Sequence, residues 1–426
     1  MKVLFHRYNS ICEPDYIEAF RALGLEVIED REEMEQKNIG IEQRVASLGE
    51  QILTQQPLFV FSINFYPYIS MVCEKLKTKY VCISVDCPVQ ELYSVQIRNA
   101  CNRVFLFDQR QYLDVVNENP DGIFSMPLGA DVARLDELLG VMDPEEKKTY
   151  RYDISFVGSL YSEKNPFADA YTRLSDHTKG VYDALLRIQS QFGGLELLES
   201  ALPDEQVLEL IRKEYEAGCL GADEIQIPGK EGINDIKEAV DSSDISSLWI
   251  RDLKRYIVVN RYLGAELTER DRLELLRTLG SALDGIAEVH LFTRSDITPL
   301  KTAGAALRFH GGVRSLDEMP RVFRTSKINI NPTMRSIQNG LPQRIWDVLG
   351  SGGFLLTSYC DELPEYFEIG THLAAYETPM EAAELTAYYL THDEEREQIA
   401  QAGYELVKAK HTVLARAAQM VKACLS

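Results

Sequence analysis

Three polar side chains lie near the start of one short predicted helix, at a position suited to binding phosphate or nucleotide. A buried strand is expected over residues 326–331 and ends at the Asn331–Pro332 turn, where proline removes a backbone donor. The helix is expected to begin at Asn339, a favourable N-cap. Its polar side carries Gln343, Arg344 and Asp347. A helix start beside a strand end is where α/β proteins bind phosphate and nucleotide.

The opposite side of this helix is apolar and is expected to face the protein core. Leu341, Ile345, Val348 and Leu349 recur at the spacing of one buried helical stripe. A glycine pair at 352–353 ends the helix and lets a strand follow directly. The segment therefore predicts the order strand, loop, short helix, strand.

Strands alternate with helices through the first 140 residues, which predicts a doubly wound parallel sheet. Strands are expected near residues 2–5, 25–28, 58–63, 80–85, 104–107 and 123–126. A ligand crevice in such a sheet lies at the carboxyl ends of the strands. The residues expected there include His6, Arg7, Asn64, Asp86 and Asp108. No Gly-x-Gly-x-x-Gly follows any of these strands, which weighs against a dinucleotide-dependent dehydrogenase.

A charged, turn-rich stretch over residues 136–148 predicts a domain boundary, and a second alternation of strands and helices follows it. Its first strand, at 152–157, leads into Gly158, Ser159 and a turn that carries Lys164 within reach of a phosphate. Residues 166–285 have helical periodicity, with the clearest helices at 206–217, 247–263 and 269–283. This segment is too long for an ordinary crossover, so we expect an inserted helical subdomain.

The composition predicts a soluble, globular, cytoplasmic protein with two α/β domains. The chain has 426 residues, 45% of them hydrophobic, and a formal net charge of -21. This acidic balance weighs against nonspecific binding to nucleic acid or to an anionic membrane surface. We find no signal-peptide region and no run long enough to span a membrane. The eight cysteines include no Cys-x-x-Cys pair, so they are expected to be buried reduced thiols.

Three motifs resemble those of GT-B glycosyltransferases, which have two Rossmann-like domains facing a cleft. Residues 156–164, FVGSLYSEK, are similar to the Val-Gly-Arg-Leu-x-x-Glu-Lys segment of retaining family 4 transferases. Residues 309–313, FHGGV, resemble their Phe-x-Gly-x-Val turn. Residues 343–357 resemble the Arg-x-Phe-Glu/Asp-x-x-x-x-Gly-x-Phe-Leu-Leu-Thr pattern of transferases related to the spore maturation protein CgeB. The N-terminal half, with MPLGAD at 126–131, is similar to the companion domain of these proteins.

This resemblance implies a division of the chain into an acceptor domain and a donor domain. Residues 1–140 would form the N-terminal acceptor domain. Residues 150–410 would form the donor domain, with the helical insertion at about 166–285. Residues 411–426 would form a helix that packs back on the N-terminal domain.

The resemblance also implies roles for residues of the donor domain. Asp347 would bind the ribose hydroxyls, since a carboxylate accepts both hydroxyl protons in charge-assisted bonds. Lys164 would neutralise the diphosphate. Ser159 stands where the family has an arginine, and Arg344 is expected to replace that charge. Asn339 stands where the wider family has a glutamate near the sugar and would hydrogen-bond a sugar hydroxyl. The remaining expected donor-binding residues are Gly158, Asn331, Gly340 and Gln343.

The expected reaction is transfer of a sugar from a UDP- or GDP-sugar, as in a hexosyltransferase, without a metal or a permanently bound cofactor. The resemblance implies retention of anomeric configuration, whereas inversion would require a base such as Asp86 or His6. His6 and Asn339 are the candidate catalytic residues, and Arg7, Asn64 and Asp86 are expected on the acceptor side. The acceptor is left open among a protein (such as a flagellin or spore-surface protein), a polysaccharide and a small molecule.

Simpler interpretations stand beside these assignments. Asp347 would be a solvated helix residue pairing with Arg344 at i, i+3, and Lys164 an ordinary surface lysine. A non-catalytic GT-B relative, acting as a glycan-binding or surface-assembly protein, is the alternative function that Asn339 and Ser159 keep open. A sugar-nucleotide epimerase of the same architecture has no distinctive motif here. The helical insertion would be a stabilising cap, an acceptor-recognition element or a dimerisation element, so a homodimer stays open.

Overall fold

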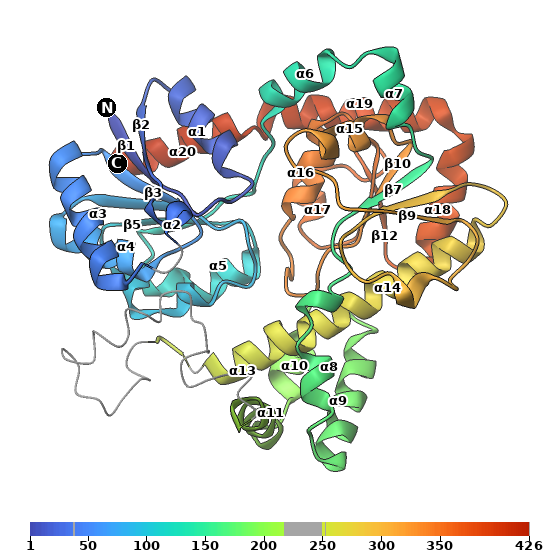
Figure 1. Ribbon diagram of the computed structural model, residues 1–426, viewed down its shortest axis with the longest axis horizontal. Helices are drawn as coiled ribbons and strands as arrows, with labels where there is room; N and C mark the ends of the chain where they lie inside the picture. The colour runs from blue at the N-terminus through green and yellow to red at the C-terminus, as the bar shows by residue number, and fades with distance from the viewer. Residues whose placement is uncertain (37–38, 217–248, 252, 426) are drawn as a thin grey trace.

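The computed structural model describes the chain except for residues 37–38, 217–248, 252 and 426, and it contains two six-stranded sheets (Figure 1). The two sheets lie side by side, each flanked by helices, and a group of helices lies below them in the view of Figure 1. Neighbouring strands are parallel in both sheets. This confirms the predicted fold class of two doubly wound α/β domains.

The first sheet has the strand order β2-β1-β3-β4-β5-β6. Its strands are β1 (Lys2–His6), β2 (Glu26–Asp30), β3 (Phe59–Ile63), β4 (Lys79–Ile83), β5 (Asn102–Leu106) and β6 (Ile123–Ser125). The helices around it include α1 (Glu13–Ala22), α3 (Ile41–Gln55), α4 (Pro67–Leu76) and α5 (Gln109–Val115). Every residue of β3 is buried, as expected for a central parallel strand with both faces covered by helices.

The second sheet has the order β12-β11-β10-β7-β8-β9. Its strands are β7 (Ile154–Val157), β8 (Val289–Phe292), β9 (Leu307–His310), β10 (Ile328–Asn331), β11 (Leu355–Ser358) and β12 (Ala374–Tyr376). Its helices include α14 (Gly264–Ala282), α15 (Glu318–Thr325), α16 (Gln343–Gly350), α18 (Pro379–Thr391) and α19 (Asp393–Lys410). The prediction that Asn339 caps α16 is wrong: the helix begins at Gln343 and Pro342 occupies the N-cap position. Pro342 has an extended backbone, which stops the helix from starting earlier.

The described part of the segment between β7 and β8 consists of helices joined by turns and irregular loops, with an isolated bridge at Trp249. It contains α8 (Phe167–Tyr171), α9 (Asp176–Gln189), α10 (Glu196–Ala201), α11 (Asp204–Glu216), α13 (Leu253–Ile257) and a π-helical stretch, η7 (Val258–Leu263). The two helices predicted at 247–263 and 269–283 are instead one continuous helix, α13–η7–α14, within the described residues. Figure 1 shows it passing beneath both sheets.

This long helix contributes to three hydrophobic cores. Tyr256 packs in the core under the first sheet, and Leu276 packs in the core under the second sheet. Val259, between them, packs among the helices of the insertion. The helix therefore joins the insertion to both sheets.

The chain crosses between the two sheets twice, and the two crossings run side by side. The N–H of Ala130 donates to the carbonyl of His411 (3.1 Å), and the N–H of Val413 donates to the carbonyl of Ala130 (3.0 Å). Two helices, α6 (Val132–Gly140) and α7 (Pro144–Thr149), occupy the stretch that was predicted to be turns. After the second crossing, α20 (Val413–Leu425) packs against α1 of the first domain (Figure 1).

The described part of the chain contains no helix that is both long and apolar enough to cross a membrane. Seven cysteines are described and all are free thiols, six of them buried and Cys360 partly buried. Cys219 lies outside the described residues.

Asp108, directly after β5, holds the two domains together at the loop that precedes α16. One carboxylate oxygen accepts from the N–H of Gln111 (2.9 Å) and so caps α5. The other accepts from the N–H groups of Asn339 (3.1 Å) and Gly340 (3.0 Å) of the second domain. Asp108 is 1% exposed, so these three bonds satisfy buried donors from both domains.

Replacing Gly340 by alanine should loosen this docking. The added Cβ would lie 2.7 Å from Asp108 Cα and 2.9 Å from the carbonyl oxygen of Phe107, and both contacts are with backbone atoms. We expect Gly340→Ala to lower the free energy of unfolding by about 1–3 kcal/mol, the usual cost of overpacking, in urea denaturation. The control is Gly311→Ala, whose Cβ would meet nothing within 4 Å. Equal stability of the two variants would contradict the close approach.

Candidate functional site

An arginine that the motifs do not include, Arg272 of α14, lies at the carboxyl ends of the two central strands of the second sheet. It donates to the carbonyl of Ser159, just after β7, and to the carbonyl of Pro332, just after β10 (3.1 Å). Strands β7 and β10 are hydrogen-bonded neighbours. The guanidinium therefore occupies the edge of the sheet where α/β proteins bind phosphate.

Tyr161 connects Arg272 to the predicted phosphate-binding lysine. Its ring lies 4.7 Å from Arg272 Cζ and 5.3 Å from Lys164 Nζ, so both cations face the same aromatic ring. The backbone of Tyr161 is left-handed (φ 75°), a conformation that costs about 1–3 kcal/mol for a non-glycine residue. Its hydroxyl lies 2.9 Å from Met334 Sδ, which holds the ring in place. Lys164 and Arg272 therefore place two positive charges beside the same ring.

Arg344 projects from the first turn of α16 toward α15. Its guanidinium lies over the ring of Phe323, with Cζ 5.0 Å from the centroid, and Nη1 donates to Met319 Sδ (2.9 Å). It makes no ion pair with Asp347, so the simpler interpretation of an i, i+3 pair is wrong for this structure. Burial lowers the pKa of Arg344, and the charge of Asp347 opposes that shift.

Arg272 and Arg344 carry positive charge without a counterion. Among the described residues, no carboxylate oxygen lies within 4.0 Å of either guanidinium. Burial lowers the pKa of Arg272, and the charge of Arg344 lowers it further, so the two groups repel each other. An arginine remains protonated at neutral pH in spite of such shifts. A bound anion between these groups would remove the repulsion and replace the lost solvation.

Asp347 lies on the side of α16 that faces the first domain. One of its oxygens accepts from Gln343 Nε2 (2.9 Å), and the same Nε2 donates to the carbonyl of Gly129 (2.9 Å). Burial raises the pKa of Asp347, while the charges of Arg344 and Arg134 oppose the shift. The carboxylate is therefore held at the domain boundary by one amide, with oxygen lone pairs left for hydroxyl donors.

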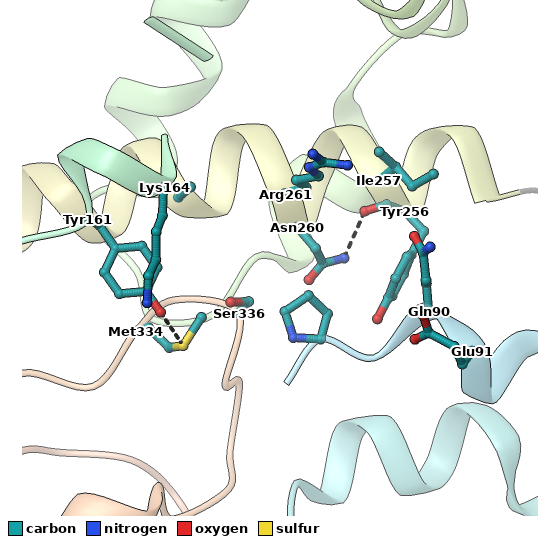
Figure 2. A pocket seen from close by; sticks show the side chains of 12 residues that line it. Gln90, Glu91, Tyr161, Lys164, Tyr256, Ile257, Asn260, Arg261, Met334 and Ser336 are labelled. Carbon is teal, nitrogen blue, oxygen red and sulfur yellow. Dashed lines mark hydrogen bonds between the residues drawn. The ribbon is translucent and has the colours of Figure 1, made fainter. Parts of the chain in front are cut away.

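A cavity of about 310 Å³ lies where the first domain, the long helix and the second domain meet. Figure 2 shows Tyr161 and Lys164 at one end of it, Gln90 and Glu91 at the other, and Asn260 of the long helix between them. The other lining residues are Pro88, Tyr256, Ile257, Arg261, Ala265, Met334 and Ser336. The cavity therefore adjoins Tyr161 and Lys164 and is bounded by all three parts of the molecule.

The remaining residues of the predicted donor set lie around the same strand ends and mostly have structural partners. Asn331 is 7% exposed and donates to Thr357 Oγ1 (2.9 Å), which joins β10 to β11. Ser159 Oγ donates to Glu163 Oε1 (2.7 Å). Gly158 lies beside Arg272. Asn339 and Gly340 are bound to Asp108 through their backbone, which leaves the Asn339 side chain outside that contact.

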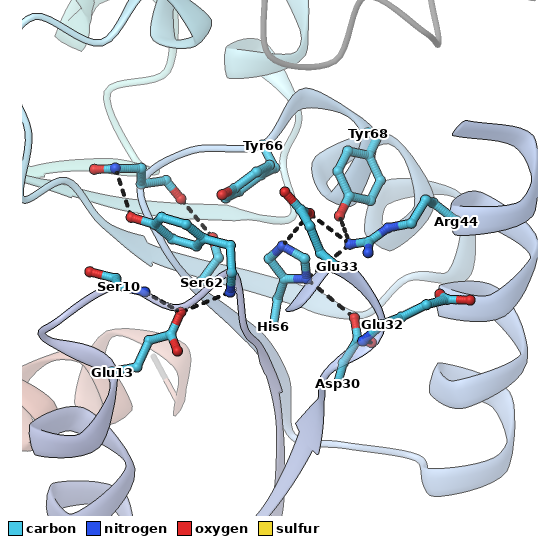
Figure 3. A network of polar contacts seen from close by, with 12 residues as sticks. His6, Ser10, Glu13, Asp30, Glu32, Glu33, Arg44, Ser62, Tyr66 and Tyr68 are labelled. Carbon is cyan, nitrogen blue, oxygen red and sulfur yellow. Dashed lines mark hydrogen bonds and ion pairs between the residues drawn. The ribbon is translucent and has the colours of Figure 1, made fainter. Parts of the chain in front are cut away.

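His6 lies in a closed polar network of the first domain (Figure 3). It is 1% exposed, with Nδ1 3.2 Å from Asp30 Oδ2 and Nε2 3.1 Å from Glu33 Oε2. Arg44 donates to the same Glu33 oxygen (2.9 Å) and to the hydroxyl of Tyr68 (2.7 Å). Burial opposes protonation of His6, but the hydrogen bonds and charges of the two carboxylates outweigh it and raise the pKa. The catalytic role of His6 stays a prediction.

Arg7, Asn64 and Asp86 were the other residues predicted for the acceptor side. Arg7 is engaged by Glu13 (3.0 Å) and by Glu29, so its donors are used within the first domain. Asn64 donates to Asp86 Oδ2 (2.7 Å) and accepts from the N–H of Val85 (3.1 Å), fixing the loop after β4. Asp86 is exposed, and its charge contributes to raising the pKa of Tyr161 in the second domain. Of the three, Asp86 alone faces the boundary between the domains.

A comparison with family models finds a similarity within the second domain. Residues 272–422 match the model of the family described as glycosyl transferase-like. This part of the chain is therefore similar to glycosyl transferase-like domains. It contains Arg272, Arg344 and Asp347, and it begins at Arg272. No curated protein matches the sequence.

Solved structures that are similar to the chain over most of its length include three from bacteria. The crystal structure of a glycosyltransferase from Rickettsia africae ESF-5 matches 100% of this chain and 98% of its own, with a TM-score of 0.51 and 12% sequence identity. Sucrose-phosphate synthase (tll1590) from Thermosynechococcus elongatus matches 99% of this chain and 98% of its own (TM-score 0.49, 11% identity). Anabaena Alr3699/HepE, in complex with UDP and glucose, also matches 99% of this chain and 98% of its own (TM-score 0.46, 10% identity). The first of these likenesses shows a GT-B fold of two α/β domains.

Sequence reasoning missed Arg272 because its partners lie far away along the chain. Ser159 and Pro332 are 113 and 60 residues from it, and α14 was interpreted as part of the insertion. The available signal was the serine at the family's arginine position, which implied that another residue supplies the charge. In the part of the chain that is described, no group of three or more His, Cys, Asp or Glu side chains could hold a metal ion.

The raised pKa of His6 predicts a pH-dependent contribution to stability. Because the pKa of the folded state exceeds the ordinary value near 6.5, this contribution is fully present below about pH 6.5 and is lost as pH rises through the folded-state pKa. We expect His6→Gln to lower the melting temperature more at pH 6 than at pH 9, by differential scanning calorimetry. The exposed His177 provides the matched control, His177→Gln. An equal loss for His6→Gln at both pH values would refute the charged network.

Proposed function

We propose that the protein is a nucleotide-sugar-dependent glycosyltransferase, with the donor bound to the glycosyl transferase-like domain. The observation that carries this proposal is the pair of half-buried arginines without counterions among the described residues, Arg272 and Arg344, the first with a buried Nε that has no partner. They belong to the domain that matches the transferase family, and Arg272 lies at its phosphate-binding edge. A nucleoside diphosphate carries the negative charge that two guanidinium groups and Lys164 together could neutralise.

The same three cations would promote departure of the nucleoside diphosphate. Negative charge grows on the diphosphate oxygens as the bond to the anomeric carbon breaks, and fixed positive groups stabilise that charge. Half-buried guanidinium groups interact more strongly with this charge than fully exposed ones would. From the resemblance to retaining family 4 transferases, the proposed transfer proceeds with retention and without a metal.

Asp347 is proposed to bind the ribose of the donor. Its carboxylate faces the boundary between the domains and has one amide partner, Gln343. Two ribose hydroxyls can donate to the remaining lone pairs in charge-assisted bonds. The acceptor would approach from the first domain and is a protein, a polysaccharide or a small molecule.

Removal of each of the two arginines tests the diphosphate site. Arg344→Met and Arg272→Gln should weaken UDP or GDP binding at least tenfold in calorimetric titration, since a charge-assisted hydrogen bond contributes about 1.5–3 kcal/mol. Arg344→Met should leave the melting temperature of the free protein unchanged or raise it, because a half-buried charge without a counterion is lost. The control is Arg277→Gln, an exposed arginine on the same helix.

A panel of UDP, GDP, ADP, TDP and their sugars should raise the melting temperature of the unaltered protein. If no nucleotide does so, the proposed donor site is wrong. If a nucleotide sugar binds but is neither hydrolysed nor transferred, the alternative of a non-catalytic, glycan-binding relative is favoured instead.

The role of Asp347 can be separated from that of the arginines with a ligand that has no ribose. Asp347→Asn should weaken UDP or GDP binding about tenfold, the loss expected for one charge-assisted hydrogen bond, and leave inorganic pyrophosphate binding unchanged. Asp121→Asn, an exposed residue of the first domain, is the control. Parallel losses for pyrophosphate and nucleotide would show that Asp347 acts on the phosphate site rather than on ribose.

A further inference from the structure

We infer that the cavity between Glu91, Asn260 and Tyr161 binds a hydroxyl-bearing sugar unit of the acceptor. This inference rests on the proposed function, because it assigns the acceptor side of the same reaction. It names a place and a ligand class: one uncharged pyranose ring, free or at the end of a glycan or glycoside. The helical insertion would supply one wall of this acceptor site.

The first observation is an unsatisfied carboxyl group in the cavity wall. Glu91 lies in a short helical turn, η1 (Gln90–Tyr93), and is 8% exposed. Its Oε1 has no hydrogen-bond partner, and no cation among the described residues pairs with its carboxyl group. Figure 2 shows the side chain at the end of the cavity beside Tyr256. A buried polar atom of this kind is costly unless a ligand satisfies it, and a sugar hydroxyl is a donor of suitable size.

The protonation of Glu91 suits a neutral ligand. Burial raises the pKa of Glu91 to about 7, and the charge of Asp86 acts in the same direction. Near neutral pH the carboxyl group is therefore partly protonated, and it can both donate to and accept from hydroxyl groups. A cationic ligand would favour a fully ionised carboxylate instead.

The second observation is the shape of the opposite wall. The π-helical stretch η7 (Val258–Leu263) interrupts the long helix at the cavity and carries Asn260 and Arg261 into its lining. Such π-helical turns occur frequently at functional sites. Asn260 is 5% exposed, and its Nδ2 donates to the carbonyl of Tyr256 (3.0 Å). Its amide oxygen is left to accept from a ligand hydroxyl.

The third observation is the position of the cavity next to the proposed diphosphate site. Tyr161 and Lys164 line the cavity, and the face of the Tyr161 ring also contacts Arg272. A ligand in the cavity would therefore lie beside the diphosphate, where an acceptor hydroxyl must approach the anomeric carbon. The volume of about 310 Å³ falls at the small end of ligand pockets, which suits one ring rather than an oligosaccharide.

Saturation-transfer NMR on the full chain with methyl glycosides of glucose, galactose, mannose, N-acetylglucosamine and rhamnose tests this inference. At least one glycoside should give a signal that saturating UDP or GDP leaves in place. Glu91→Ala and Asn260→Ala should each weaken binding of that glycoside at least tenfold, whereas Glu91→Gln, which keeps an acceptor and a donor, should bind it more tightly than Glu91→Ala. These variants should retain their affinity for UDP or GDP. The control is Glu137→Ala, an exposed glutamate of α6.

The outcomes separate this inference from the proposed function. Absence of signal from every glycoside, or full binding by both Glu91→Ala and Asn260→Ala, overturns the acceptor site even when nucleotide binds. Loss of glycoside binding in Glu91→Ala with unchanged nucleotide affinity supports it. Glycoside binding that depends on Glu91 in a protein that binds no nucleotide would support the cavity as a sugar site and refute the proposed transferase activity.

Discussion

The hydrogen bonds of Asp108 are the constraint on which the arrangement of both domains depends. One carboxylate caps a helix of the first domain and binds the backbone N–H groups of Asn339 and Gly340 in the second. The loop that contains Asn339 leads directly into α16. This contact therefore also positions the start of the helix that carries Arg344 and Asp347. Because Gly340 lies against the backbone of Asp108, no side chain fits between the domains at this point.

The long helix α13–η7–α14 supplies the second tie between the domains and gives the site its charge. It starts in the core of the first domain, continues through the insertion and ends under the second sheet. Its residues Asn260 and Arg272 consequently reach the cavity wall and the strand ends from a single rigid element. A group that must hold a ligand is better placed on such an element than on a loop.

The sequence predicted those features that depend on neighbours along the chain. Alternating strands and helices, the polar side of α16 and the turn with Lys164 follow from local periodicity and turn chemistry. Features set by distant contacts escaped prediction. Asn339 is a residue type that often caps helices, but its N–H donates a hydrogen bond to Asp108, which is 231 residues away along the chain. His6 was expected in the loop after the first strand, but it is the last residue of β1, and carboxylates from β2 and the next helix, α2 (Glu32–Glu35), enclose it.

The arginine position illustrates how a site can keep its charge while a motif loses it. Ser159 stands where the resemblance implied an arginine, and its carbonyl accepts from Arg272 of a different helix. Binding of an anion depends on where a guanidinium lies and on how little solvent surrounds it, and the segment that supplies it is immaterial. Holding two such groups half-buried without carboxylates is unfavourable in the free protein. In the proposed function, a nucleoside diphosphate that neutralises them would recover that free energy on binding.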